Sequence, residues 1–432
     1  MASMHKNRRK VFMKKIAGGV AVFPSALQAM RTHSTEYRFR QDANFYYLTG
    51  FDEPEAVCVI APDHPEHQYV LFVRPRVPEQ EVWTGKRAGV EGAKEQFGAD
   101  EAYPIEEFDE KISEYIGTSE RLYYGFGEDE AFNWKIIELL KGYRRQRMRE
   151  GTGPTTLIDP TDILAEMRLV KDEAELERIR TAVDISVEAH IAAMQAVRPG
   201  MYEYELESLI DSIYRKNGGM GPAFLTIVAK GANATTLHYT RNDCQIEDGD
   251  LVLIDAGCEY QYYCGDITRT FPASGKFTDA QRAIYQAVLD LQCEIIDSIR
   301  PGVSIGDPAQ KAVEMLTEAM LELGLLAGEK EKIIEEQEYR KFYMHSVGHM
   351  LGVEVHDVAK TREGEEYKTF QPGMVMTVEP GLYVNPDSEN VPPEYLGIGI
   401  RIEDNILVTE SGCEVLTASV PKRIDEIEKL MA

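Results

Sequence analysis

The stretch "LVLIDAGCEYQYYCGDITRTF", residues 251–271, combines the pattern of buried strands with two acidic side chains. Its first four residues, 251–254, are all apolar, which predicts a strand buried on both faces. Asp255 follows at once, and Asp266 comes eleven positions later, after a second strand-like run. An ionised carboxylate in such a place costs several kcal/mol unless a cation neutralises it. The stretch therefore predicts a bound cation.

Length, composition and charge describe a globular protein of two domains. At 432 residues the chain is too long for one compact core. An apolar content of 43% with 28% charged residues is typical of a soluble protein, and no apolar run approaches the roughly 18 residues of a membrane span. The formal net charge is -26, from 47 basic and 73 acidic residues. Because nucleic acid and anionic membranes require a basic surface, we expect neither as a partner.

The cysteines and the N-terminus both bear on the compartment. The six cysteines, at positions 58, 244, 258, 264, 293 and 413, include no C-x-x-C pair, so neither a zinc ribbon nor a dithiol redox site is indicated. A reducing, cytoplasmic setting is expected. "KNRRKVFMKK" followed by "IAGGVAVFPSALQAM" imitates the basic and apolar regions of a signal peptide. Two glycines and Pro24 interrupt the apolar run, however, and we favour a basic helix, a glycine turn and a first strand over 20–23.

Two regions differ in organisation. Up to about residue 150, short strands such as 56–62 and 69–75 alternate with helices such as 128–147, and a Gly/Pro-rich linker over 150–156 follows. A long helix is then predicted over 170–197, with Asp172 and Glu175 in the capping-box pattern. His190 lies in this helix beside an apolar stripe, and we interpret it as a packed residue.

The second region contains a weak internal repeat. "AVRPGMYEYELESLI" (196–210) and "SIRPGVSIGDPAQKAVEML" (298–316) share the order helix, Arg-Pro-Gly, helix, with the prolines 102 positions apart. Each is followed by strands rich in Asp, Glu and His. The repeat predicts two similar α+β halves with a site at the seam between them.

Further acidic residues interrupt apolar strand-like runs in this region, where packing alone would supply Val or Ile. Glu379 lies in "MVMTVEPGLYV" and Glu403 in "GIGIRIEDNILV". If these two converge with Asp255 and Asp266, four negative charges match two divalent cations, and a bound hydroxide remains as the nucleophile. Oxygen-rich ligation suits Mn²⁺, Mg²⁺ or Fe²⁺. Two such ions about 3.5–4 Å apart lower the pKa of a shared water and polarise a carbonyl.

The motifs DAG…GDITRTF, H-x-x-x-H, VHDV, TVEPGLY and GIRIED, in this order, resemble those of the pita-bread metallopeptidases, in particular the aminopeptidase P family. Residues 34–57, 81–87 and 275–288 extend the resemblance over almost the whole chain. It implies an α+β protein with a creatinase-like N-terminal α/β domain, 1–168, for oligomerisation and substrate access. A catalytic pita-bread domain with a pseudo-twofold repeat, 169–432, would follow.

The resemblance also implies a role for each site residue. Asp255 would bind one metal ion, while Asp266 and Glu403 would bridge two. His349 and Glu379 would complete the shell of the second ion, with Glu379 also handling the proton of the bridging water. The pocket would be lined by His238, His345, His356, Arg401 and Tyr383. Mn²⁺ is the expected metal, with two ions per subunit.

The implied reaction is release of the N-terminal residue from peptides with proline in the second position. The proline nitrogen must be protonated as it leaves, and imidazoles with pKa values near neutrality suit that step. A homo-oligomer, a dimer or a tetramer, is implied as well. Trp83 in "EVWTGKR" either reaches a neighbouring subunit's site or packs locally. The charged segment 357–371 does not match the family, and its contact with substrate is left open.

Two local predictions and two rival functions remain. Glycines near His345 and His349 favour a loop over a helix. Strand alternation places Arg401 and Glu403 on one face of a single strand. A prolidase, which cuts Xaa-Pro dipeptides, shares the five ligands and needs a cation for the free carboxylate. A catalytically inert pita-bread binding module is the alternative of a different class.

Overall fold

The computed structural model describes residues 2–127 and 129–432, which form two units divided between Met167 and Arg168. Glu128, the first residue of the helix predicted over 128–147, lies outside the described residues. No helix in the described part of the chain is both long and apolar enough to cross a membrane.

A six-stranded mixed sheet forms the centre of the first unit, in the order β4-β3-β2-β1-β5-β6. The strands are β1 (Gly19–Pro24), β2 (Val57–Ile60), β3 (Tyr69–Val73), β4 (Glu101–Pro104), β5 (Arg121–Tyr123) and β6 (Thr156–Ile158). The helices are α1 (Ala2–Lys15), α2 (Ala43–Thr49), α3 (Pro78–Thr84), α4 (Gly89–Glu95), α5 (Phe108–Ile116), α6 (Glu130–Glu150) and α7 (Thr161–Leu169). The strands predicted over 20–23, 56–62 and 69–75 and the basic N-terminal helix are therefore confirmed.

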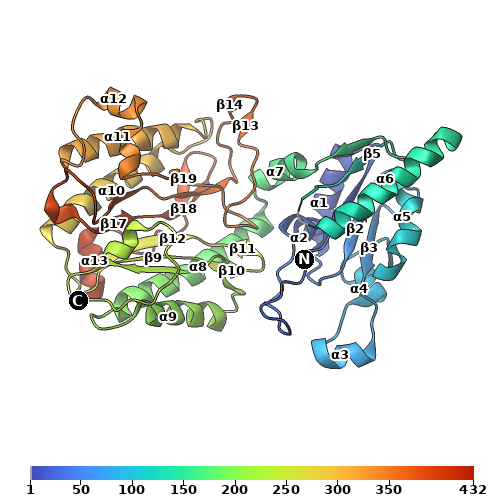
Figure 1. The fold of residues 1–432 in the computed structure, drawn as a ribbon, viewed down its shortest axis with the longest axis horizontal. Coiled ribbons are helices and arrows are strands. Elements are labelled where there is room, and N and C mark those ends of the chain that lie inside the picture. Colours follow the sequence, from blue (N-terminus) through green and yellow to red (C-terminus); the bar gives the residue numbers. More distant parts are fainter. Residues whose placement is uncertain (1, 128) are drawn as a thin grey trace. The chain divides into compact units, whose positions relative to one another are not determined.

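Helices cover both faces of this sheet (Figure 1). Apolar side chains of α5 and α6 pack with alternate residues of the sheet, such as Val20, Val59 and Phe72. On the opposite face Phe12 of α1 contacts Phe23 of β1, with ring centroids 5.6 Å apart. This arrangement explains why the apolar run near the N-terminus is so short: it is a buried strand, and Gly18 makes the turn before it with φ of +78°.

The second unit contains the predicted repeat as two helix pairs. They are α8 (Glu173–Ala196) with α9 (Glu203–Lys216), and α10 (Asp279–Ser298) with α11 (Asp307–Glu322). In each pair an Arg-Pro-Gly turn joins the helices, and its glycine, Gly200 or Gly302, has positive φ. The capping box predicted for Asp172 and Glu175 is present at the start of α8. In Figure 1 the green α8 and α9 lie below the strands and α10 and α11 above them.

Each half of the second unit also contributes a three-stranded antiparallel sheet. The first has the order β12-β9-β8, from β8 (Ile227–Lys230), β9 (Leu251–Ala256) and β12 (Ile267–Pro272). The second has the order β15-β18-β19, from β15 (Val375–Val378), β18 (Asp404–Val408) and β19 (Cys413–Val415). The remaining elements are β7 (Gly221–Pro222), β10 (Cys258–Tyr260), β11 (Tyr263–Cys264), β13 (Arg362–Glu363), β14 (Glu366–Tyr367), β16 (Gly381–Val384), β17 (Ile398–Arg401), α12 (Lys330–Glu335) and α13 (Ile424–Met431).

The opening strand is buried as predicted, and so is the histidine behind it. β9 lies between β8 and β12, and all six of its residues are buried. His190 of α8 is fully buried, and its Nε2 lies 3.0 Å from the carbonyl oxygen of Ala256. Burial lowers the pKa of His190 to about 4, so the ring is neutral and packed, as expected. All six cysteines are free thiols.

Candidate metal centre

A cavity of about 580 Å³ in the second unit brings the predicted site residues together. Its acidic and basic lining residues are Asp255, Asp266, Glu379, Glu403, His238, His345, His349, His356 and Arg401. Its apolar lining includes Phe224, Leu225, Ile227, Leu237 and Val355. Of the predicted site residues, Tyr383 does not line the cavity and instead contacts two residues that do.

The pseudo-twofold repeat explains why four carboxylates meet here. In the first half Ala256 of β9 pairs with Ile267 of β12, so that Asp255 and Asp266 lie at the end of this strand pair. In the second half Val378 of β15 pairs with Asp404 of β18, and Glu379 and Glu403 lie just beyond that pair. The backbone N–H of Glu403 donates to the carbonyl of Thr268 at 3.0 Å, which joins the two halves. Each half therefore contributes two carboxylates to one seam.

Two glycines make close contacts that a side chain would block. A Cβ on Gly257 would lie 1.7 Å from the carbonyl oxygen of Gly265, so the glycine allows the segments bearing Asp255 and Asp266 to approach. A Cβ on Gly348 would lie 2.0 Å from the carbonyl oxygen of Thr377. The segment containing His345 and His349 is irregular, which confirms the predicted loop.

Three of the residues have the geometry of a metal site. Ligand atoms of Asp266, His349 and Glu403 all lie within 4.8 Å of one another. His349 Nε2 is 3.4 Å from Asp266 Oδ2 and 3.5 Å from Glu379 Oε1. The imidazole is thus placed between carboxylates of the two halves.

The carboxylates lack sufficient positive charge from the protein. Burial raises the pKa of Asp266 well above its usual range, and the charges of Asp255 and Glu379 raise it further. Burial also raises the pKa values of Glu379 and Glu403. Among the described residues, no lysine or arginine forms an ion pair with Asp266, Glu379 or Glu403. This donor set, rich in carboxylate oxygen with one imidazole, fits hard divalent cations.

Asp255 differs from the other three because it has one cationic partner. Its Oδ2 accepts a hydrogen bond of 2.6 Å from Arg401 Nη2. Its Oδ1 is buried and has no hydrogen-bond partner in the described part of the chain. An orphaned buried carboxylate oxygen is costly, and a cation would satisfy it.

The prediction that Arg401 and Glu403 share one strand is wrong. Strand β17 ends at Arg401 and pairs with β16, whereas β18 begins at Asp404 and pairs with β15. The apolar pattern reads as continuous because both short strands are buried. Arg401 and Glu403 nevertheless both line the cavity, since Thr268 Oγ1 accepts from Arg401 Nε at 3.1 Å and donates to Glu403 Oε2 at 2.7 Å.

Thr268 and Asn405 hold the predicted ligands in place and were missed by the sequence analysis. The side chain of Asn405 accepts from the backbone N–H of Asp266 at 3.1 Å and donates to the carbonyl of the same residue. Strand alternation carried a signal for Thr268, which lies two residues after Asp266 and therefore on the same face. For Asn405 no such signal exists, because its partner lies 139 positions away.

A hydrogen-bonded chain links Arg401, Tyr383 and His345. Arg401 Nη1 donates to the Tyr383 hydroxyl at 3.0 Å, and this hydroxyl lies 2.8 Å from His345 Nε2. His345 Nδ1 lies 2.7 Å from the carbonyl oxygen of Ser346, so Nδ1 carries the proton and Nε2 accepts from the tyrosine. Burial and the charge of Arg401 lower the pKa of His345 to about 4, and burial raises the pKa of Tyr383 to about 12. Both groups are therefore neutral at physiological pH.

The other two histidines lie nearer to solvent. The ring of His356 contacts that of His349, with centroids 4.4 Å apart and the planes at 80°. Burial, followed by the charges of His349 and His238, lowers the pKa of His356. His238 is exposed on the segment between β8 and β9.

The charged segment 357–371 is exposed only in part. Its hairpin of β13 and β14 is exposed. Asp357, however, is buried, and its carboxylate accepts hydrogen bonds from Arg168 at 2.5 Å and from Lys171 at 3.0 Å. These two cations outweigh the cost of burial and lower the pKa of Asp357. The network fixes the chain directly after His356.

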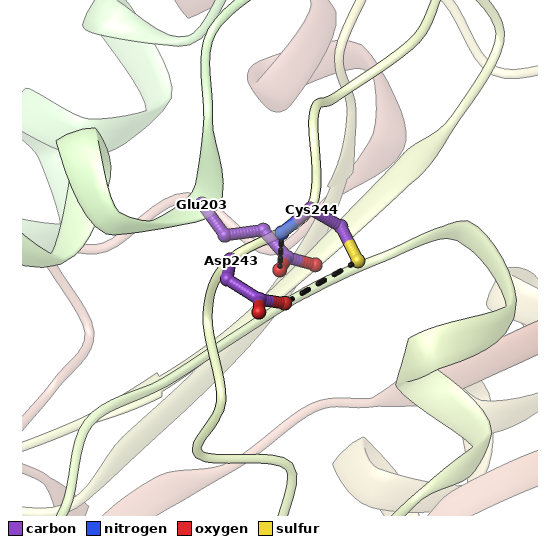
Figure 2. A group of neighbouring side chains, drawn as sticks. All are labelled: Glu203, Asp243 and Cys244. Atoms are coloured by element: carbon purple, nitrogen blue, oxygen red, sulfur yellow. Dashed lines mark hydrogen bonds between the residues drawn. The ribbon is translucent and has the colours of Figure 1, made fainter.

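A second group of potential ligands, Glu203, Asp243 and Cys244, lies in the same unit (Figure 2). Both oxygens of Glu203 already accept hydrogen bonds from the protein. The group therefore does not fit a metal ion as the cavity does.

Two family descriptions match the chain. Residues 177–410 match metallopeptidase family M24, and residues 5–123 match the aminopeptidase P N-terminal domain. Xaa-Pro aminopeptidase of Escherichia coli K12 is 42% identical over 432 residues, which cover 99% of this chain and 97% of that protein. The structure of Pseudomonas aeruginosa aminopeptidase PepP matches with a TM-score of 0.96 at 43% identity, covering 100% of this chain and 98% of that one. A zinc-substituted E. coli aminopeptidase P in complex with product matches with a TM-score of 0.94 at 42% identity, covering 100% of this chain and 98% of that one.

Proposed function

Because this chain belongs to the Xaa-Pro aminopeptidases of metallopeptidase family M24, we propose that it releases the N-terminal residue from peptides with proline in the second position. The observation that supports this most strongly is the group of four carboxylates around one cavity, three of them buried. In the described part of the chain, only Asp255 of the four pairs with an arginine. Such a group is a poor structural element, because buried like charges destabilise the fold, and a good ligand set.

Two divalent cations, with Mn²⁺ preferred, would be held by the five predicted ligands: Asp255, Asp266, His349, Glu379 and Glu403. When bound, the cations would lower the pKa of a water between them and polarise the scissile carbonyl. Glu379 would take the proton of that water; its oxygens lie 3.5 Å from His349 Nε2 and 4.0 Å from His345 Nδ1. The carboxylate is therefore directed at the centre of the site.

The remaining pocket residues bind and protonate the substrate in this proposal. His238 and His356 lie at the more exposed side of the cavity, where an imidazole N–H can donate to the leaving proline nitrogen. Arg401, Tyr383 and His345 act as one chain, which would hold the guanidinium in place. Because a guanidinium has five N–H donors, Arg401 can pair with Asp255 and still direct a hydrogen bond at a developing oxyanion.

The first unit is proposed to assemble subunits and to control access to the site, with residues 1–168 as that domain and 169–432 as the catalytic one. On α3, Trp83 is 87% exposed and Val82 is 82% exposed. An exposed tryptophan beside an exposed valine is typical of a contact with another chain. We propose a homo-oligomer, a dimer or tetramer, in which Trp83 reaches a neighbouring subunit's site, and a cytoplasmic location.

The prolidase alternative is less well supported. A prolidase needs a free cation for the carboxylate of its dipeptide substrate. Arg401 is the one lysine or arginine in the lining of the cavity as far as the chain is described, and it is engaged by Asp255 and Tyr383. An inert binding module, for its part, has no need of four carboxylates in one cavity.

Turnover of an Xaa-Pro-Yaa tripeptide compared with an Xaa-Pro dipeptide tests the proposal. We expect cleavage of the tripeptide, with the free N-terminal residue as product, and kcat/KM at least about tenfold lower for the dipeptide. Preference for the dipeptide would replace the proposal with prolidase activity. Absence of cleavage in protein reconstituted with Mn²⁺ would favour the binding module.

A further inference from the structure

The segment that carries His238 has little regular structure of its own. It runs from the end of β8 to the start of β9 and contains only a short 3₁₀ turn, η2 (Gly231–Thr235). Within the described part of the chain, the imidazole of His238 forms no hydrogen bond. The position of this ring in the cavity therefore depends on how the segment is anchored.

One buried carboxylate anchors the segment on both sides of His238. Glu203, the first residue of α9, is fully buried. Its Oε1 accepts from the backbone N–H of Lys230 and from Asn233 Nδ2, both at 2.9 Å. Its Oε2 accepts from the Tyr239 hydroxyl at 2.8 Å and from the backbone N–H of Cys244 at 2.9 Å. Two donors thus precede His238 in the chain and two follow it.

These bonds account for the whole acceptor capacity of the carboxylate. An ionised carboxylate offers about four lone-pair directions, and Glu203 uses four. The neighbouring polar groups are engaged elsewhere, since Asp243 Oδ2 accepts from Arg241 Nε at 2.5 Å and Cys244 Sγ lies 3.7 Å from Asp243 Oδ1 (Figure 2). Glu203 therefore holds protein groups rather than a ligand.

We propose that Glu203 is a positioning residue for His238, acting through Tyr239 and the backbone of the segment 230–244. The inference rests on the proposed function, because it assumes that His238 contacts the substrate. An ionised acceptor matters here because all four partners are donors. In Glu203→Gln the amide nitrogen would face donors, and at least one buried N–H would lose its partner. The segment would then sample positions in which His238 is displaced.

The test compares five variants with wild type by activity and by hydrogen exchange: Glu203→Gln, His238→Ala, their combination, Asp243→Asn and Tyr239→Phe. Glu203→Gln is expected to lower kcat/KM for an Xaa-Pro-Yaa tripeptide by about 10-fold to 100-fold, because small displacements of a reacting group are costly. Metal content should not change. Asp243→Asn is the matched control, since this side chain is exposed and makes no bond to η2, and its activity should stay within about twofold of wild type.

The decisive variant is Glu203→Gln combined with His238→Ala. If Glu203 acts through His238, adding Glu203→Gln to His238→Ala should change kcat/KM by less than about twofold. Hydrogen exchange should accelerate in peptides covering 230–245 and remain unchanged in β15 and β18. Tyr239→Phe removes one of the four bonds and replaces Glu203→Gln in the test if that variant fails to fold. It should lower kcat/KM by a smaller factor and accelerate exchange in the same peptides.

Two results would overturn the inference: multiplication of the two single losses in the double variant, or unchanged exchange over 230–245. If wild type cleaves no Xaa-Pro peptide, the proposed function fails instead. The exchange measurement still decides in that case whether Glu203 holds the segment.

Discussion

Arg401 and Asp255 form a half-satisfied pair: the guanidinium donates to Asp255 Oδ2 at 2.6 Å, while Asp255 Oδ1 remains buried without a hydrogen-bond partner in the described chain. One oxygen of the carboxylate is therefore fixed by the protein and the other is left for a ligand. The same guanidinium reaches Thr268 and Tyr383, so that its fork orients three groups at once.

Arg401→Lys should damage catalysis without removing the metal. A lysine keeps the positive charge but cannot contact Asp255, Tyr383 and Thr268 together. We expect kcat/KM for a tripeptide to fall by about 100-fold, the size seen when an oriented donor at a reacting oxyanion is lost. Metal analysis should give the wild-type content. Wild-type activity in this variant would show that the charge alone suffices.

Asp266→Asn should have opposite effects on metal-free and metal-bound protein. In metal-free protein the buried Asp266 is repelled by Asp255 and Glu379, so its neutral amide should raise Tm by a few degrees, corresponding to about 1–2 kcal/mol. With Mn²⁺ the wild type should have the higher Tm, because it binds the ions more tightly and gains stability by mass action. Scanning calorimetry with and without Mn²⁺ measures both, and an equal shift in the two states would contradict the account.

Asp266 also makes the stability of the metal-free protein depend on pH. Its pKa is raised in the folded state, so the folded protein binds more protons than the unfolded chain above a pH of about 3.9. Stability should therefore fall as pH rises from 5 to 7 through this group. The Tm advantage of metal-free Asp266→Asn over metal-free wild type should widen over the same interval. A constant difference would mean that Asp266 is not the titrating group.

Asp357 gives the stability of the protein the opposite pH dependence, because Arg168 and Lys171 outweigh its burial and lower its pKa. Its contribution to stability is present above the unfolded pKa of about 3.9 and is lost as pH falls through the lower folded value. Asp357→Asn should cost about 3–5 kcal/mol at pH 7, since two buried cations lose their partner, and the difference from wild type should shrink below pH 4.

Glu354→Gln is the matched control for this network. Glu354 also pairs with Arg168, at 2.6 Å, but its side chain is 40% exposed. Glu354→Gln should lower Tm, measured by calorimetry at pH 7, by well under half as much as Asp357→Asn does. Equal losses would indicate that burial does not decide the strength of these pairs.

His356→Ala should lower kcat while the metal content stays at the wild-type value. The ring contacts that of His349 but is not among the predicted ligands. We expect about 100-fold loss if the imidazole protonates the leaving nitrogen. His67→Ala, a histidine outside the cavity lining, should have no effect. Unchanged kcat in His356→Ala would remove this residue from the proposed proton transfer.

Local patterns predicted the backbone of the site well. Three predictions that depend only on short stretches of sequence are confirmed: the buried strand before Asp255, the two Arg-Pro-Gly turns and the capping box at Asp172. The apolar run indicates that the first strand ends near Asp255, whereas Glu403 was predicted inside a strand that the structure divides. The strand contexts singled out the four carboxylates, and the family resemblance added His349 and the predicted role of each residue.

Contacts between distant segments could not be predicted in the same way. The stretch 398–408 has the alternating pattern of one strand, so the split between β17 and β18 is revealed only by the change of partner strand. The bond between Asn405 and Asp266 and the four bonds of Glu203 depend on how the two halves and the loops pack. The residues next to these supporting side chains in the sequence form no motif, which is why the sequence analysis missed them.

The central claim is that Asp255, Asp266, His349, Glu379 and Glu403 together hold two cations that activate a water. Titration of chelated protein with Mn²⁺, following bound metal and tripeptide turnover in the same samples, tests it most directly. We predict two ions bound per chain, with activity absent in the chelated protein and restored as the sites fill. Full turnover in protein that binds no metal, or saturation at two ions in a variant lacking both Asp266 and Glu403, would contradict the account.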